Sequence, residues 1–200
     1  MTSYFLIDAD GRNRRLLTNT PDREERDPAW SPDGAQVAYI AERPGQVRDA
    51  VWTIRPDGTN ARVIGGAANY PEQPTWSPDS RHIAFSSSSR DDNTRIWIVD
   101  LDDRNLRSLS RGDIDIAPHW TSRGDILFIR GYRVIAVDPD TGTETPLPLS
   151  ALDVSSSPKG DWLTLGEGTG IVLTTRDDEG RRVLIKRRGL IYSAPAWRPA

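Results

Sequence analysis

The chain has 200 residues, 36% of them hydrophobic and 28% charged, a composition typical of a globular protein that buries its own core, which excludes extensive disorder. It contains no cysteine, which excludes disulfides and thiolate chemistry and leaves the redox compartment open. The formal net charge of -3 excludes a strong overall field for nucleic acid or anionic lipid, so we expect local features to select any partner.

Two properties of the chain concern membranes and export. No apolar run approaches the roughly 18 residues that a membrane-spanning helix needs, and segment 1–8 is too short for a signal peptide. We therefore expect no membrane partner and a cytoplasmic location, or a periplasmic or extracellular one if the sequence was cut from an exported precursor.

The N-terminal segment predicts two short strands, at residues 4–8 and 14–17, joined by the turn sequence Asp-Ala-Asp-Gly. In the repeats that follow, strands of this kind come third and fourth in groups of four. The first two strands of such a group are therefore missing at this end of the chain.

A Pro-x-Trp phrase then recurs along the chain at intervals of about 40 to 50 residues, the period of four-stranded propeller blades. The copies occupy residues 27–34, 73–80, 117–124 and 194–199. A degenerate copy at 154–160 has Ser156 where tryptophan is expected.

The tryptophans of the four good copies keep a fixed place in the repeat, as packing between blades requires. We expect them to be core residues and not ligand-stacking groups. They are Trp30, Trp76, Trp120 and Trp197.

Each phrase is followed by short segments rich in β-branched residues and bounded by turn sequences. The predicted second strands are 37–40, 83–86, 126–129 and 162–165. The predicted third strands are 51–54, 96–99, 134–137 and 171–174. Because these runs are almost continuously apolar, we expect neighbouring sheets to cover both faces. Weaker fourth strands follow at 62–64, 107–109 and 183–185.

Three phrases carry a family resemblance: Trp-Ser-Pro-Asp-Gly at 30–34, Val-Ala-Tyr at 37–39 and Ile-Trp-Ile-Val-Asp at 96–100. Together they resemble the repeat of TolB-type propellers, also called the WD40-like or PD40 repeat. The resemblance covers essentially the whole chain and implies an all-β propeller. It says little about function, because the repeat occurs in periplasmic scaffolds, peptidase gating domains, lyases and sensors.

We therefore predict one all-β domain over residues 1–200, a β-propeller of five four-stranded antiparallel blades. The last blade is a composite closed by both termini, which would remove exposed strand edges. The alternative is a fragment, or an open ring that self-associates through its terminal strands. The predicted blades are 27–66, 73–112, 117–149, 154–189, and 193–200 with 4–19.

Antiparallel connectivity places the tight repeated turns at one end of every blade and the dissimilar loops at the other, where binding residues concentrate. The inter-blade links are rich in carboxylates near the ring axis. Such groups clamp a cationic group or bind a metal through oxygen, with calcium in the central channel as the candidate cofactor. The predicted ligand-binding residues are Asp27, Glu72, Asp115, His119 and Asp153.

Two alternatives to this site remain open. The carboxylates are also explained as solvated loop charge, or as partners of Arg26 and Arg111, and no spacing resembles a calcium loop. His119 stands where the other copies have small residues, so it is either a channel histidine or a structural group at a blade interface.

The function predicted from these features is that of a non-catalytic binding or scaffold propeller. It would recognise a peptide, a protein partner or a small ligand on its variable-loop face or in its central funnel. The alternative is a carboxylate-dependent enzyme, glycosidase-like or lyase-like, with its site in the funnel. No nucleophile elbow or P-loop is present, and the basic residues of segment 181–188 lack the interleaved aromatic residues of nucleic-acid binding surfaces.

Overall fold

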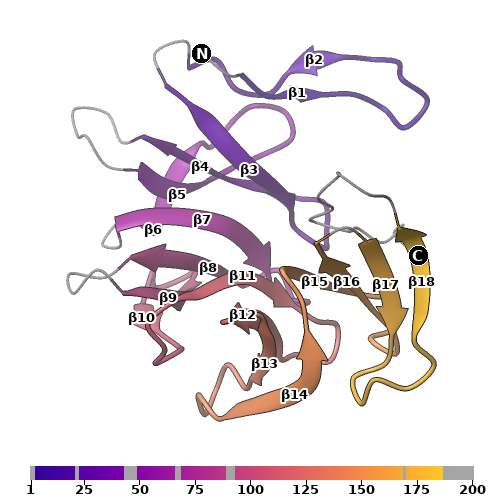
Figure 1. Ribbon diagram of the computed structural model, residues 1–200. Coiled ribbons are helices and arrows are strands. Elements are labelled where there is room, and N and C mark those ends of the chain that lie inside the picture. The colour runs from indigo at the N-terminus through magenta and orange to yellow at the C-terminus, as the bar shows by residue number, and fades with distance from the viewer. Residues whose placement is uncertain are drawn as a thin grey trace.

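The computed structural model describes residues 3–20, 23–42, 49–65, 69–88, 93–168 and 170–186, and every regular element in these ranges is a β-strand. Four four-stranded antiparallel sheets and one two-stranded sheet are arranged around a common axis (Figure 1). This confirms four propeller blades. Within these ranges, no helix has the length and apolarity needed to cross a membrane.

The sheets follow one another in chain order, and the first is a two-stranded hairpin. The hairpin consists of β1 (Phe5–Leu6) and β2 (Arg15–Leu16). Blade 1 consists of β3 (Glu25–Trp30), β4 (Val37–Glu42), β5 (Asp49–Ile54) and β6 (Arg62–Gly65). Blade 2 consists of β7 (Asn69–Trp76), β8 (His82–Ser88), β9 (Thr94–Asp100) and β10 (Leu106–Ser108).

Blades 3 and 4 repeat the same order of pairing, with the first strand of each group at the inner edge. Blade 3 consists of β11 (Asp115–Trp120), β12 (Ile126–Arg130), β13 (Arg133–Val137) and β14 (Glu144–Ser150). Blade 4 consists of β15 (Asp153–Ser156), β16 (Leu163–Glu167), β17 (Gly170–Thr174) and β18 (Arg182–Lys186).

The middle strands are apolar on both faces because each face meets a different neighbouring blade. In β12, Phe128 belongs to the cluster between blades 2 and 3, whereas Leu127 belongs to the cluster between blades 3 and 4. Both are fully buried. Successive strand residues point to opposite faces, so one strand contributes to two interfaces. The core is therefore a series of clusters between sheets.

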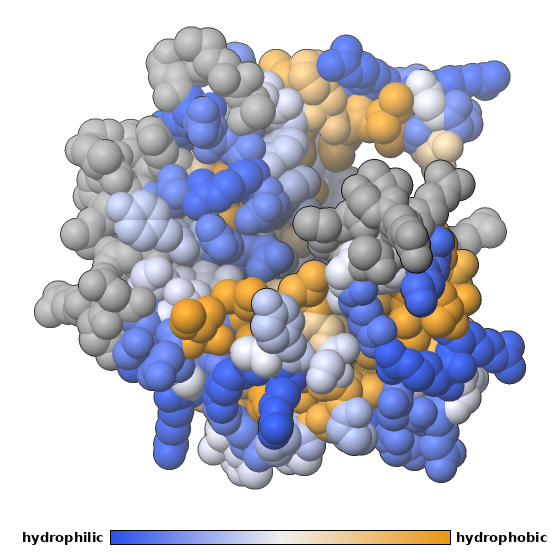
Figure 2. Space-filling model, viewed as in Figure 1, coloured by the Kyte–Doolittle hydropathy of each residue, from blue (hydrophilic) through white to orange (hydrophobic). Residues whose placement is uncertain are grey.

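The first and last of the described sheets, the N-terminal hairpin and blade 4, expose apolar side chains. All of β18 is exposed, including Val183 and Leu184, and the N-terminal hairpin exposes Phe5 and Leu16. Figure 2 shows apolar surface over both places. The hairpin supplies two strands of the predicted composite blade, and residues 193–200 lie outside the described residues. Closure of a fifth blade thus remains a prediction.

The tryptophans differ in burial. Trp76 and Trp120 are buried, as predicted. The same prediction is wrong for Trp30, which is 52% exposed. The Trp76 indole donates a hydrogen bond to the Ala29 carbonyl of the preceding blade (3.0 Å), whereas the described part of the sheet before Trp30 is only the two-stranded hairpin. Trp197 lies outside the described residues.

Candidate binding site on the propeller axis

The inner strands of blades 1, 2 and 3 each contain a bulge at the residue before proline. Asp27, Gln73 and Ala117 have φ angles of 55°, 52° and 53° there. For a residue other than glycine this left-handed conformation costs about 1–2 kcal/mol. Hydrogen bonds between blades offset the cost: the Gln73 N–H donates to the Asp27 carboxylate (3.0 Å), and the Ala117 N–H donates to the Gln73 side-chain carbonyl (3.1 Å). Asp27 is therefore a link between blades.

Asp115, the third predicted site residue, is completely buried and is bound by Arg130. Arg130 donates to both of its carboxylate oxygens, at 2.6 and 2.9 Å, and the Gly112 N–H adds a third bond (3.0 Å). Arg130 also bridges to Glu144 at 2.7 Å. Hydrogen bonds to Asp115 and Glu144 raise the pKa of Arg130 above its ordinary value. The negative charge of Asp115 is thus balanced by Arg130 inside blade 3.

Glu72 and Asp27 lie in the field of one arginine at the junction of blades 1 and 2. The Arg26 guanidinium donates to Asp49 at 2.6 Å and to the Pro71 carbonyl at 3.2 Å. Burial alone lowers the pKa of Arg26, but the hydrogen bond to Asp49 and the charges of Asp27 and Glu72 raise it on balance. The structure therefore brings Glu72 and Asp27 together around a cation.

The fifth predicted residue, Asp153, begins β15 and is half-buried, and its carboxylate accepts the N–H of Val154 (2.8 Å). Among the described residues, no three His, Asp or Glu side chains form a group that could hold a metal ion. The five predicted residues thus serve several separate local networks.

His119 lies towards the tight-turn end of β11 and contacts the next blade. Its Nε2 accepts the N–H of Ser156 (3.0 Å) and lies 2.9 Å from the Ser156 hydroxyl. Thr75 has the same role one blade earlier, where its hydroxyl accepts the Trp120 N–H (3.2 Å). Burial lowers the pKa of His119 to about 4, so the ring is neutral at pH 7 with its proton on Nδ1.

A pocket of about 250 Å³, here called the axial pocket, opens at this tight-turn end beside His119. Residues of all four blades converge on it because the same turn recurs around the axis. Its walls consist of proline rings, two tryptophan indoles, the His119 ring and serine side chains. They come from Pro32, Trp76, Pro78, His119, Trp120, Ser122, Ser156, Ser157 and Pro158.

The local sequence fixes the turns that form this pocket. The Ser77 hydroxyl bonds to the Asp79 carboxylate (2.5 Å) and accepts the His82 N–H (2.9 Å), which holds Pro78 at the rim. Ser31 makes the same contacts around Pro32. Of the predicted site residues only His119 lines this pocket, because the sequence analysis set the repetitive turns aside. The usable signal was the proline itself, which recurs in three of the four turns that meet on the axis.

Comparison with known proteins identifies the family. The TolB beta propeller domain, PD40, matches residues 2–136. The chain belongs to this TolB propeller family. An uncharacterised protein of Agrobacterium fabrum is 27% identical over 143 residues, which cover 65% of this chain and 47% of that protein. An uncharacterised peptidase, YuxL of Bacillus subtilis, is 24% identical over 108 residues, 52% of this chain and 16% of the peptidase.

Among solved structures, TolB from Acinetobacter baumannii superposes with a TM-score of 0.74 at 19% identity, covering 92% of this chain and 49% of that one. At this identity the likeness shows the fold. The chain spans about half the length of its Agrobacterium fabrum relative and a smaller share of the peptidase.

Proposed function

We propose that this TolB-family propeller is a non-catalytic binding module that takes an apolar side chain of a peptide or protein partner into the axial pocket. The observation that carries the proposal is the pocket itself, where tight turns of four blades place prolines beside Trp76 and Trp120. Aromatic and proline surfaces held by a rigid scaffold favour an apolar group at low cost in conformational entropy.

The size of the pocket favours a side chain over a whole small molecule. Its volume of about 250 Å³ lies below the roughly 300–1,000 Å³ of typical small-molecule sites. One large side chain of a partner fills such a space, and buried anchors of this kind carry most of the binding energy of protein interfaces. Because His119 is neutral, the described lining of the pocket contains no cation that would select an acidic group.

The contacts of the carboxylates favour binding over catalysis. Asp115 and Asp27 accept hydrogen bonds from the chain's own groups, and among the described residues no carboxylate lines the axial pocket. A glycosidase-like mechanism needs two carboxyl groups facing one open site. The chain's own contacts therefore support a structural role for these residues.

Selection from a displayed peptide library tests this function. Peptides selected on the protein are expected to share an apolar or aromatic residue. Pro78→Arg, which places a long charged side chain at the pocket rim, should weaken their binding about tenfold or more, or by about 1.4 kcal/mol. Pro146→Arg makes the same change at an exposed position of β14 and should leave binding unchanged. Equal affinity for both variants, or a selection without an apolar consensus, would refute the proposal.

A further inference from the structure

A second site lies between blades 2 and 3, away from the axis. A groove of about 420 Å³ runs between the outer strands of blade 2 and the turn that joins β13 to β14. Three arginines line it, Arg95, Arg107 and Arg111, and the facing turn contributes one carboxylate, Asp140. We refer to it as the arginine groove. Its formal charge is three minus one, or +2, in a chain whose net charge is -3.

Two of these arginines are not held by carboxylates in the part of the chain that the structure describes. Neither Arg107 nor Arg111 forms a salt bridge with any carboxylate of the described residues, whereas Arg26, Arg130 and Arg181 each do. Arg107 instead donates to the Pro139 carbonyl across the groove, which fixes its side chain and leaves further N–H donors for a ligand. Both side chains are exposed, so an anion can reach them.

The walls of the groove are rigid. Leu109 is 4% exposed and belongs to the cluster between blades 2 and 3. On the opposite wall, the Asp138 carboxylate accepts the N–H groups of Asp140 (2.9 Å) and Thr141 (2.8 Å) and fixes the turn. A site whose walls are already ordered loses little entropy when a ligand binds.

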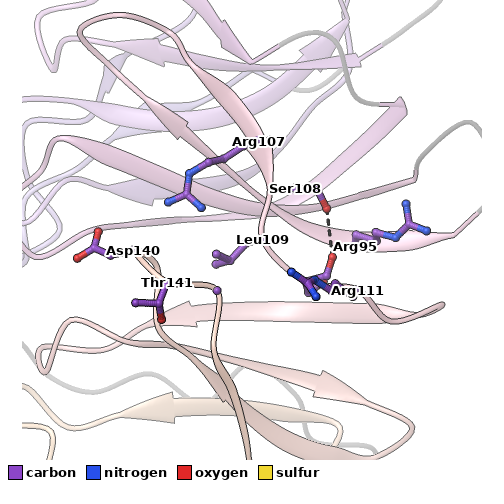
Figure 3. Close-up of a pocket in the computed structure, with 9 residues that line it drawn as sticks. Arg95, Arg107, Ser108, Leu109, Arg111, Asp140 and Thr141 are labelled. Atoms are coloured by element: carbon purple, nitrogen blue, oxygen red, sulfur yellow. Dashed lines mark hydrogen bonds between the residues drawn. The ribbon is translucent and has the colours of Figure 1, made fainter.

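The spacing of the arginines indicates the kind of anion. Arg107 and Arg95 lie on opposite sides of Ser108, so their guanidinium groups do not converge on one point (Figure 3). A single phosphate needs converging donors, whereas separate planar guanidinium groups each match one carboxylate in a bidentate pair. We propose that the arginine groove binds an acidic peptide segment, whose Asp or Glu side chains pair with Arg107 and Arg111.

Fluorescence anisotropy with a labelled hexaglutamate peptide tests this proposal. The double variant Arg107→Gln/Arg111→Gln should bind the peptide about tenfold more weakly than the unaltered protein, with a smaller dependence on salt. Arg55→Gln/Arg133→Gln removes the same charge from two exposed arginines elsewhere and should change affinity less than about twofold. Thermal unfolding of both variants confirms that the fold is retained.

Further arms of the experiment separate the possible ligands. A labelled hexaglutamine peptide should not bind, and inorganic phosphate at equal ionic strength should not displace hexaglutamate. Equal loss of binding in both double variants would show that the net charge of the protein attracts the peptide, and would overturn the proposal. Displacement by phosphate would identify a phosphate site instead and would also overturn it. Pro78→Arg should leave hexaglutamate binding unchanged, so this site and the axial pocket are tested independently.

Discussion

The two ends of the inner strands use their polar residues differently. At the loop end, Asp27 and Asp115 are bound by groups of the chain itself, a backbone N–H in one case and Arg130 in the other. At the tight-turn end, prolines and indoles surround an open pocket. The Asp27 and Asp115 carboxylates near the propeller axis thus serve the fold, one between blades 1 and 2 and the other within blade 3, while the repeated turns leave room for a ligand.

The largest expected effect comes from removing Arg130, the cation that binds Asp115 at the loop end of blade 3. Arg130→Ala leaves the fully buried Asp115 carboxylate without its cation, and removing one partner of a buried pair costs about 3–5 kcal/mol. The free energy of unfolding in urea measures this loss. Arg133→Ala, at an exposed position of the same blade, should change it by less than about 0.5 kcal/mol. Equal stability of the two variants would contradict a structural role for Asp115.

The next effect concerns pH at the tight-turn end. The pKa of His119 is about 4 in the folded protein and about 6.5 in the unfolded chain, so the unfolded state binds more protons between these values. The contribution of neutral His119 to the free energy of unfolding is therefore fully present above pH 6.5 and is lost as pH falls towards 4.

His119→Gln keeps an acceptor for the Ser156 N–H and removes the titration. The loss of stability between pH 6.5 and 4.5 should be smaller in this variant by about 2 kcal/mol. Chemical unfolding at a series of pH values measures it. An identical pH dependence in the two proteins would show that the pKa of His119 is the same in the folded and unfolded states, which contradicts this prediction.

A smaller effect is expected for the link between blades 1 and 2. Asp27→Ala removes the acceptor of the Gln73 N–H and places alanine at a φ angle of 55°, which together should cost about 1–2 kcal/mol. Glu24→Ala, at an exposed neighbouring position, serves as the control in the same unfolding experiment. If Asp27→Ala is no less stable than this control, the bulge needs no bond between blades.

The smallest effect is expected at Glu72, which is exposed. Glu72→Gln should change the free energy of unfolding by less than about 0.5 kcal/mol, because an exposed carboxylate near Arg26 gains little in water. The same variant should bind the selected peptides as tightly as the unaltered protein. Weaker peptide binding would place the ligand at the loop end and reverse the comparison between the two ends.

The sequence was sufficient to predict the four blades, because recurring turn residues, such as the Ser-Pro-Asp of blades 1 and 2, and the apolar runs mark the strands locally. It did not reveal the exposure of Trp30, since burial there depends on the neighbouring sheet. Nor did it reveal the role of Asp115. Arg130, its partner, is 15 residues away and reaches it only across a strand pair. The axial pocket was missed because each turn alone is ordinary, and only the ring brings four of them together.

We propose that this propeller binds its partner at the tight-turn end. Titration of the ¹⁵N-labelled protein with a selected peptide, followed by NMR, locates the contact surface. We expect the indole N–H resonances of Trp76 and Trp120 to shift on binding, while the backbone N–H resonances of Gln73 and Ala117 at the loop-end bulges stay in place. Shifts of the Gln73 and Ala117 amides with unmoved indoles would contradict it.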